Sequence, residues 1–252
     1  MSRMAIALLG SGEFEPWSEP VDRTLLAQAR RGAGKVLILP TASAPEGDEV
    51  FEMWCQKGLD HFRSLGIEAE VVPLRTKADA DNPAIVSRLR SASMVYFSGG
   101  NPAYLAAMLA GTRFWRALRW ALPRGLAYAG CSAGAACLGP QAPDSSVLDP
   151  TSDFWRPGLG AFPTTYVAPH WDALDSYVPG LAALIVAAVP PACRLLAIDE
   201  STAVAGNGVD WTVIGKSAAH IWRSGTWLHF PAGASFSLPA FRRAARPSRS
   251  MG

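Results

Sequence analysis

Short apolar runs recur along the first half of the chain, and each is followed by a longer stretch with helical spacing. Apolar residues in the runs do not alternate with polar ones, which is typical of strands buried on both faces of a sheet. The predicted strands are residues 4–9, 35–40, 69–74, 94–97, 126–129 and 194–198. The predicted helices between them are residues 21–31, 49–65, 83–90, 102–110 and 112–122.

Alternating strands and helices of this kind predict βαβ units. We therefore expect an α/β fold of three layers, with a doubly wound, mostly parallel, flavodoxin-like sheet. After residue 200 the pattern changes to short strands separated by the turn sequences GNG at 206–208 and RSG at 223–225. These turns predict a C-terminal β-hairpin region. Residues 1–238 are expected to form a single domain, and the arginine-rich segment 239–252 a disordered tail.

Charge and cysteine usage narrow the classes of function. The 252 residues carry 23 Lys and Arg against 21 Asp and Glu, a balance that argues against a nucleic-acid partner. The four cysteines form no CxxC pair and no zinc-ligand spacing, which predicts no metal site and a cytoplasmic protein with reduced thiols. The apolar run 181–189 is too short to span a membrane. A homodimer is compatible with the sequence.

The stretch AGCSAGA at 129–135 contains two candidate nucleophiles, Cys131 and Ser132. Residues 130–134 match the motif G-x-S-x-G with Ser132 at the centre, between an apolar strand and a helix of small residues. Centring the turn on Cys131 would put alanines at both positions where a sharp turn favours glycine. The register therefore favours Ser132 as the nucleophile.

A second glycine loop, Gly99-Gly100, follows the strand at 94–97, one βα unit before Ser132. Neighbouring parallel strands end at the same edge of a sheet, so this loop is expected beside the serine. Backbone N–H groups in such positions can stabilise the negative charge of a tetrahedral intermediate. The predicted oxyanion donors are Gly100 and Ala133.

Other loops at the expected edge supply candidate substrate-binding residues. The sequence GSG at 10–12 follows the first strand, but it lacks the third glycine of a dinucleotide fingerprint. Tryptophans 17, 155 and 171 fall in the loops assigned to the site, where they would line an apolar subsite or cover the edge of the sheet. The predicted substrate-binding residues are Gly12, Gly99, Asn101 and Trp171.

A catalytic serine needs a base, and the chain has four histidines. His61 lies in a helical stretch and is expected at the surface. His220 and His229 lie in the C-terminal hairpin region, where we expect them to pack beside tryptophans. His170 follows a long Pro-, Gly- and Asp-rich excursion at 139–168 that can return to the edge of the sheet. We therefore predict that His170 is the base.

The acid that orients this histidine is expected where the strand at 194–198 ends, because Asp199 and Glu200 follow it directly. Glu200 is the first choice, since the residue beyond the strand end would point toward the site. Asp199, Asp172 and Asp153 are the alternatives.

Together these motifs resemble the serine peptidase family of dipeptidase E and cyanophycinase, a branch of the class I glutamine amidotransferase-like fold. The matching pieces span about residues 4–215 and are FSGGN at 97–101, GCSAGA at 130–135, GLG at 158–160 with PH at 169–170, and IDESTA at 198–203. The resemblance implies that Ser132 is the nucleophile, His170 the base and Glu200 the acid. It also implies oxyanion donors at Gly100 and Ala133, with no metal or organic cofactor.

The chain departs from this pattern around the histidine. Family members that cleave next to aspartate are expected to carry polar residues before it and arginines after it. Here AP precedes His170, WDALD follows it, and no arginine occurs between Arg156 and Arg194. A substrate carboxylate needs a cationic partner, which only Arg156 or a residue distant in sequence could supply. We therefore predict that neutral or basic residues are preferred over aspartate at the scissile position.

The sequence thus predicts a serine hydrolase that acts on a small peptide or amide through an acyl-enzyme. Three alternatives differ from it in testable ways. An α/β-hydrolase esterase would combine Ser132 with an acid at 199–200 and a histidine at 220 or 229. A cysteine amidotransferase would use Cys131. A catalytically silent binding protein would keep the fold without the reaction.

Overall fold

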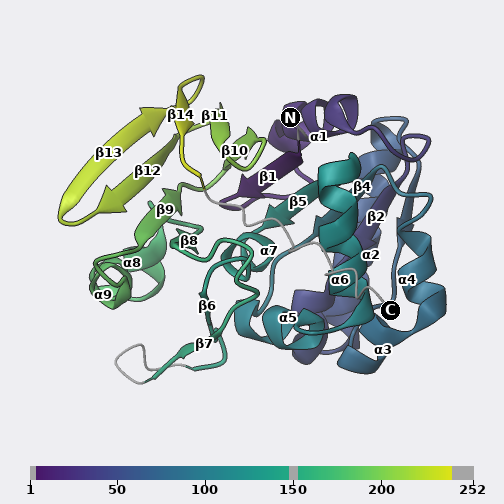
Figure 1. The fold of residues 1–252 in the computed structure, drawn as a ribbon, viewed down its shortest axis with the longest axis horizontal. Helices are drawn as coiled ribbons and strands as arrows, with labels where there is room; N and C mark the ends of the chain where they lie inside the picture. Colours follow the sequence, from purple (N-terminus) through teal and green to yellow (C-terminus); the bar gives the residue numbers. More distant parts are fainter. Residues whose placement is uncertain (1–3, 148–152, 240–252) are drawn as a thin grey trace, which may run out of the picture.

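The computed structural model describes residues 4–147 and 153–239. At its centre lies an eight-stranded sheet (Figure 1). From β1 to β3 the neighbouring strands are parallel, and β10, β11 and β14 extend the other edge in antiparallel pairing. The strands in spatial order are β14 (Ser235–Ser237), β11 (Asp210–Gly215), β10 (Thr202–Gly206), β1 (Ala5–Leu9), β5 (Ala127–Cys131), β4 (Met94–Phe97), β2 (Val36–Leu39) and β3 (Ala69–Val71).

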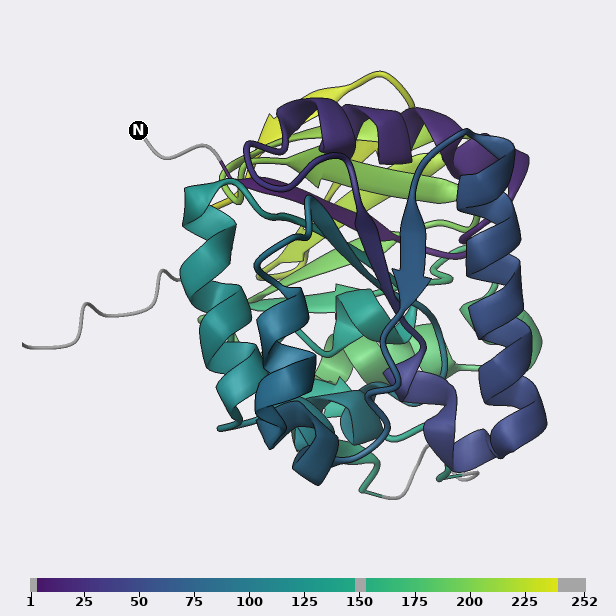
Figure 2. The ribbon, with the colours of Figure 1, turned by 90° about the vertical axis from the view of Figure 1, so that its right-hand side faces the viewer.

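Helices cover both faces of this sheet, and Figure 2 shows the strands enclosed between them. Alternate strand residues face opposite layers: Ala7 packs in one cluster with α1 and α2, and Leu8 packs in another with α3 to α6. The expected three-layer α/β fold with a mostly parallel sheet is confirmed. The helices of the two layers are α1 (Glu19–Gln28), α2 (Asp48–Ser64), α3 (Lys77–Asp81), α4 (Pro83–Arg88), α5 (Pro102–Leu109) and α6 (Arg113–Ala121).

A second sheet of four strands lies beside the first, at the left of Figure 1. Parallel strands β8 (Thr165–Ala168) and β9 (Arg194–Ile198) form one half of it, and the hairpin of β12 (Ala218–Arg223) and β13 (Thr226–Pro231) forms the other. The strand β8 was not predicted, because it lies at the end of the irregular excursion. Shorter elements near this sheet are β6 (Gln141–Pro143), β7 (Trp155–Pro157), α7 (Ala133–Ala136), α8 (Leu174–Tyr177) and α9 (Leu181–Ala188).

The C-terminal hairpins form with the expected turns, but they belong to different sheets. The hairpin of β10 and β11 joins the large sheet, whereas that of β12 and β13 joins the second one. Both sheets contribute to one hydrophobic core, in which Leu196 and Ala219 pack in the same cluster as Val204. Of the predicted tail, residues 240–252 lie outside the described residues.

One sequence expectation is wrong: His61 is buried rather than at the surface, with 8% of its area exposed. Its Nε2 atom lies 2.8 Å from Asp22 Oδ2, and Asp22 is fully buried on α1. The ring therefore joins α2 to α1 through a buried polar contact, which helical periodicity alone does not reveal. Within the described residues, every helix is too short or too polar to cross a lipid bilayer.

Candidate active site

Ser132 occupies a sharp turn between β5 and α7, with φ of 48° and ψ of −107°. Such backbone angles are strained for a residue with a side chain and occur at functional turns. The flanking glycines are required sterically. A Cβ atom on Gly130 would lie 2.3 Å from the Gly134 carbonyl oxygen, and one on Gly134 would lie 2.5 Å from the Phe97 carbonyl oxygen. The turn is thus centred on Ser132, in the register that the motif predicted.

Cys131 is directed into the core instead. Its side chain has no exposed area, and its Sγ donates to Glu13 Oε2 at 2.8 Å. Burial, and next the neighbouring Glu13 carboxylate, raise the pKa of the Cys131 thiol well above its usual value. The thiol therefore stays protonated, which is the opposite of what a cysteine nucleophile needs.

His170 and Glu200 reach the serine from the second sheet. The parallel strands β8 and β9 pair Ala168 with Ala197, and each of the two site residues follows its strand by two positions. Parallel strands end at the same edge, so both side chains arrive together. His170 Nε2 lies 2.9 Å from Ser132 Oγ, and His170 Nδ1 lies 3.0 Å from Glu200 Oε1.

These contacts fix the position of the histidine proton. A carboxylate accepts hydrogen bonds only, so Nδ1 of His170 carries a proton that it donates to Glu200. The Nε2 atom is then free to accept the hydroxyl proton of Ser132. His170 also has a positive φ of 55°, which marks a second strained position beside the first.

The ends of the two sheets are held together at the glycine loop that follows β1. A Cβ atom on Gly10 would lie 2.0 Å from the Asp199 carbonyl oxygen, so only glycine permits this approach. Ser11 Oγ accepts the Ser201 N–H at 3.0 Å, and the Ser132 N–H donates to the Leu9 carbonyl oxygen at 3.0 Å. The loop at 10–12 therefore positions Glu200 relative to the serine.

Two further contacts hold Glu200. Tyr177 donates its hydroxyl to Glu200 Oε1 at 2.7 Å, and the Glu200 N–H donates to Asp172 Oδ1 at 2.8 Å. The hydrogen bond from His170, followed by the one from Tyr177, lowers the pKa of Glu200 below its usual value. The group is therefore a carboxylate at neutral pH and favours a proton on His170 Nδ1.

The side chains considered as alternatives to Glu200 and His170 interact with residues other than Ser132. Asp199 Oδ1 lies 3.0 Å from His220 Nε2, and Asp199 Oδ2 accepts from Ser217 Oγ at 2.7 Å. His220 Nδ1 lies 3.2 Å from His229 Nδ1, and the His220 ring packs against Trp227. This group stabilises the second sheet, and its contacts do not include Ser132 within the described residues. Asp153 is exposed and forms an ion pair with Arg156.

The predicted oxyanion donors lie next to the serine. Gly100 is at the edge of the same cavity as Ser132, and Ala133 is the first residue of α7. Within the described residues, neither N–H group has a hydrogen-bond partner. The loop before Gly100 is fixed by Glu13, whose Oε1 accepts the Gly99 N–H at 2.7 Å. Glu13 is only 4% exposed, so this carboxylate joins the first glycine loop to the second.

The four predicted substrate-binding residues are not among the described residues that line the cavity beside the serine. A Cβ atom on Gly99 would lie 3.6 Å from Ser132 Cβ, and one on Gly12 would lie 2.5 Å from Trp17 Nε1. The Asn101 side chain caps α5 through the Tyr104 N–H and donates to Asp144. Trp171 packs against Trp227, with ring centroids 5.1 Å apart. The role of these residues in substrate binding stays a prediction.

A cavity of about 390 Å³ opens beside Ser132 and His170. Most of its wall is apolar, and part of it comes from β7, β8, α8 and α9, which lie in the left half of Figure 1. Among the tryptophans assigned to the site, Trp155 lines this cavity. Its volume is within the range of ligand pockets, about 300–1,000 Å³.

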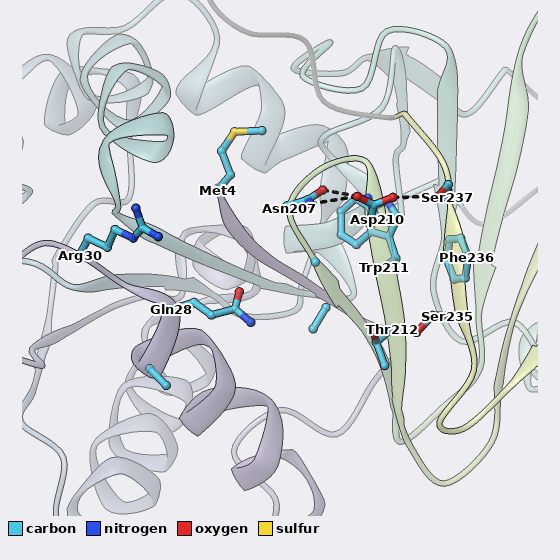
Figure 3. Close-up of a pocket in the computed structure, with 13 residues that line it drawn as sticks. Met4, Gln28, Arg30, Asn207, Asp210, Trp211, Thr212, Ser235, Phe236 and Ser237 are labelled. Atoms are coloured by element: carbon cyan, nitrogen blue, oxygen red, sulfur yellow. Dashed lines mark hydrogen bonds between the residues drawn. The ribbon is translucent and has the colours of Figure 1, made fainter. Parts of the chain in front are cut away.

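A larger hollow, of about 840 Å³, lies at the opposite end of β1, beside Met4 and Trp211 (Figure 3). Its Asp210 carboxylate accepts hydrogen bonds from Asn207 and Ser237 and is therefore already engaged. Ser132, in contrast, follows the carboxyl end of the parallel strands, where open α/β sheets bind their ligands. In the described part of the chain, no three His, Cys, Asp or Glu side chains are arranged to hold a metal ion.

Sequence reasoning missed Glu13 and Tyr177. The signal for Glu13 was available, because a carboxylate directly after a glycine loop at a strand end lies at the functional edge of such a sheet. No comparable signal exists for Tyr177. It reaches Glu200 only because α8 follows β8 through a tight turn, which the sequence does not specify.

Comparisons with known proteins show which sequences this chain is similar to. Cyanophycinase from Nostoc sp. (strain PCC 7120 / SAG 25.82 / UTEX 2576) is 25% identical over 236 residues, which cover 87% of this chain and 74% of the relative. Cyanophycinase from Synechococcus elongatus is 29% identical over 160 residues, which cover 59% of this chain and 47% of that relative.

Solved structures of peptidases are also similar to this chain. The crystal structure of a peptidase from an acI-B1 Actinobacterium is 31% identical and superposes with a TM-score of 0.84, over 94% of this chain and 97% of the other. A putative peptidase E protein from Listeria monocytogenes EGD-e shares the fold, with 18% identity and a TM-score of 0.60 over 85% of this chain and 100% of its own. A sequence model of peptidase family S51 matches residues 6–214, and the chain therefore belongs to peptidase family S51.

Proposed function

We propose that this peptidase cleaves small peptides or amides through an acyl-enzyme on Ser132. One observation carries the proposal: hydrogen bonds connect Glu200, His170 and Ser132 Oγ in a continuous series beside an apolar cavity. Nucleophile, base and orienting acid stand in the same relation in other serine hydrolases of unrelated fold. Membership of a peptidase family supports an amide bond as the target.

In the first half of the reaction, Ser132 Oγ attacks the carbonyl carbon of the substrate and its proton passes to His170 Nε2. Glu200 accepts the hydrogen bond from Nδ1–H throughout and stabilises the positive charge that forms on the ring. The N–H groups of Gly100 and Ala133 donate to the oxygen of the tetrahedral intermediate. His170 then gives its proton to the leaving amine, which departs and leaves the acyl-enzyme.

In the second half, a water molecule takes the place of the amine. His170 accepts a proton from this water, which attacks the ester carbonyl on Ser132. Collapse of the second tetrahedral intermediate returns the proton to Ser132 Oγ and releases the acid product. Every proton in these steps thus moves through His170 Nε2.

The experiment compares three enzymes on a library of dipeptides and N-blocked peptides. The wild type should hydrolyse some members, Ser132→Ala should lose turnover by several orders of magnitude, and Cys131→Ala should retain it. Circular dichroism of both variants controls for folding. If folded Ser132→Ala kept wild-type turnover while folded Cys131→Ala lost it, the nucleophile would be Cys131 and the proposal would be wrong.

A further inference from the structure

Three aromatic rings form one wall of the cavity beside Ser132. Phe154 and Trp155 stack with centroids 5.0 Å apart, and Tyr166 meets Trp155 edge to face at 5.6 Å. Because each ring is held by the next, the wall is rigid before a ligand arrives. Aromatic ligands gain additional attraction from such stacked and edge-to-face arrangements.

Aliphatic side chains also line the cavity, and they belong to the same hydrophobic cluster as Trp155 and Tyr166. Leu181 and Ile185 come from α9 and Leu195 from β9, and all three belong to the small hydrophobic cluster beneath the second sheet. Leu195 is fully buried and Ile185 nearly so. An apolar ligand group placed in the cavity would therefore leave water for an aromatic and aliphatic surrounding.

The charges of the cavity disfavour an acidic ligand group. Among the described lining residues none is lysine or arginine, and the carboxylate of Asp144 is part of the wall. Hydrogen bonds from Ser146 and Asn101 lower the pKa of Asp144, so it is charged at neutral pH. Arg156, the cation that could have bound a substrate carboxylate, instead lies 3.9 Å from Asp144 and 3.7 Å from Asp153.

The two aspartates that follow His170 in the sequence, Asp172 and Asp175, have backbone partners instead of facing the cavity. Asp172 accepts the Glu200 N–H, and Asp175 accepts the Ala182 N–H at 2.9 Å. Neither is among the described residues that line the cavity. The negative charge that an acidic side chain would meet in the cavity is that of Asp144.

The position of the oxyanion donors indicates which residue of the substrate enters the cavity. Gly100, Ser132 and Ala136 line the same cavity, so a carbonyl group held by the N–H groups of Gly100 and Ala133 lies at its edge. The side chain on the Cα atom that adjoins this carbonyl carbon is the group that can enter. We infer that the cavity binds the side chain of the residue whose carbonyl Ser132 attacks, and that this residue is large and apolar, best of all phenylalanine.

This inference rests on the proposed function for the identity of the attacked carbonyl, but binding can be measured without turnover. Isothermal titration calorimetry of Ser132→Ala should compare three dipeptides, Phe-Ala, Ala-Phe and Asp-Ala. A single methylene group in an apolar pocket changes affinity or rate by about 10–200-fold. We therefore expect Phe-Ala to bind at least about tenfold more tightly than either of the other two. A smaller preference over Asp-Ala, or tighter binding of Ala-Phe, would overturn the inference.

An arginine introduced into the cavity wall, compared with one introduced at an exposed position, tests whether the cavity binds the side chain. Leu181→Arg should lower the affinity for Phe-Ala and raise that for Asp-Ala by about tenfold or more. Ala183→Arg adds the same charge to an exposed position of the same helix and should leave both affinities unchanged. If Leu181→Arg behaved like Ala183→Arg while its melting temperature matched the wild type, the cavity would not be the side-chain site.

Measurements of turnover distinguish the inferred side-chain specificity from the proposed acyl-enzyme chemistry. If Phe-Ala binds best but the wild type hydrolyses no substrate, the cavity assignment stands and the proposed acyl-enzyme chemistry fails. If the wild type hydrolyses Asp-Ala with at least the kcat/KM of Phe-Ala, the proposed chemistry stands and the inferred specificity fails. A kcat/KM for Phe-Ala more than tenfold that for Asp-Ala, about 1.4 kcal/mol in the transition state, supports both.

Discussion

Replacing Glu13 by alanine should damage catalysis, although this residue makes no contact with Ser132 in the described structure. Its buried carboxylate accepts the Gly99 N–H at 2.7 Å and the Cys131 thiol at 2.8 Å. Removing it leaves a buried N–H without an acceptor, a penalty of about 1–3 kcal/mol. The loop can avoid this penalty only by turning the Gly99 N–H toward another acceptor, which also moves the adjoining N–H of Gly100.

Loss of one oxyanion donor costs about 10²–10³ in kcat, equivalent to about 2.7–4 kcal/mol. Because the loop moves only partly out of place, we expect Glu13→Ala to lower kcat by about 10–1,000-fold. Substrate affinity depends on the cavity rather than on this loop, so KM should change little. A fall in kcat without a rise in KM is the signature of an interaction made in the transition state.

The assay measures kcat and KM for Glu13→Ala, Glu13→Gln and the wild type, with melting temperatures as the folding control. Glutamine keeps an oxygen acceptor for the Gly99 N–H, so Glu13→Gln should retain kcat within about tenfold. If Glu13→Ala melted at a lower temperature but kept the wild-type kcat, Glu13 would have a structural role only. Equal damage in both variants would also refute the reasoning, because it would assign the effect to the charge rather than to the hydrogen bond.

Three other predictions follow from the same contacts. Replacing His170 by alanine should lower kcat by several orders of magnitude and Glu200→Gln somewhat less, and near-normal turnover in either variant would refute the assignment. Tyr177→Phe removes a hydrogen bond that helps to lower the pKa of Glu200. The variant should lose up to about 1 kcal/mol of stability above pH 4.5, the usual pKa of the group, because Tyr177 is exposed and Glu200 is only partly buried. The difference from the wild type should disappear as the pH falls through the lowered pKa, and urea unfolding at several pH values checks this. Gly134→Ala should lower the melting temperature and abolish turnover because its Cβ would collide with the Phe97 carbonyl, and a stable, active variant would contradict the tight turn.

Sequence periodicity predicted the central sheet and its helices because their burial leaves a direct signature. The strand β2 is apolar at every position because helices cover both its faces, and β1, β4 and β5 are buried in the same way. The nucleophile turn was also predictable, since its glycines are required by contacts of 2.3 and 2.5 Å that no other residue permits.

The second sheet was harder to predict from sequence. The strand β8 is only four residues long and follows an irregular excursion, so the pattern gave no indication that it pairs with β9. The prediction that His170 and Glu200 meet depended on the family resemblance and on chain order, whereas the parallel pairing of β8 and β9 supplies the physical reason. The cavity wall was unpredictable for a related cause, because its members come from elements that meet only after the two sheets pack together.

The most direct test of the account is labelling of the wild-type enzyme with a fluorophosphonate, followed by peptide mass spectrometry to locate the modified residue. We predict stoichiometric phosphonylation of Ser132, greatly slowed in His170→Ala and unaffected by Cys131→Ala. Since the reagent needs an activated serine and an oxyanion site but no particular side chain, the result does not depend on the inferred specificity. Absence of labelling in a folded enzyme, or labelling of another residue, would contradict the assignment of Ser132 as the nucleophile.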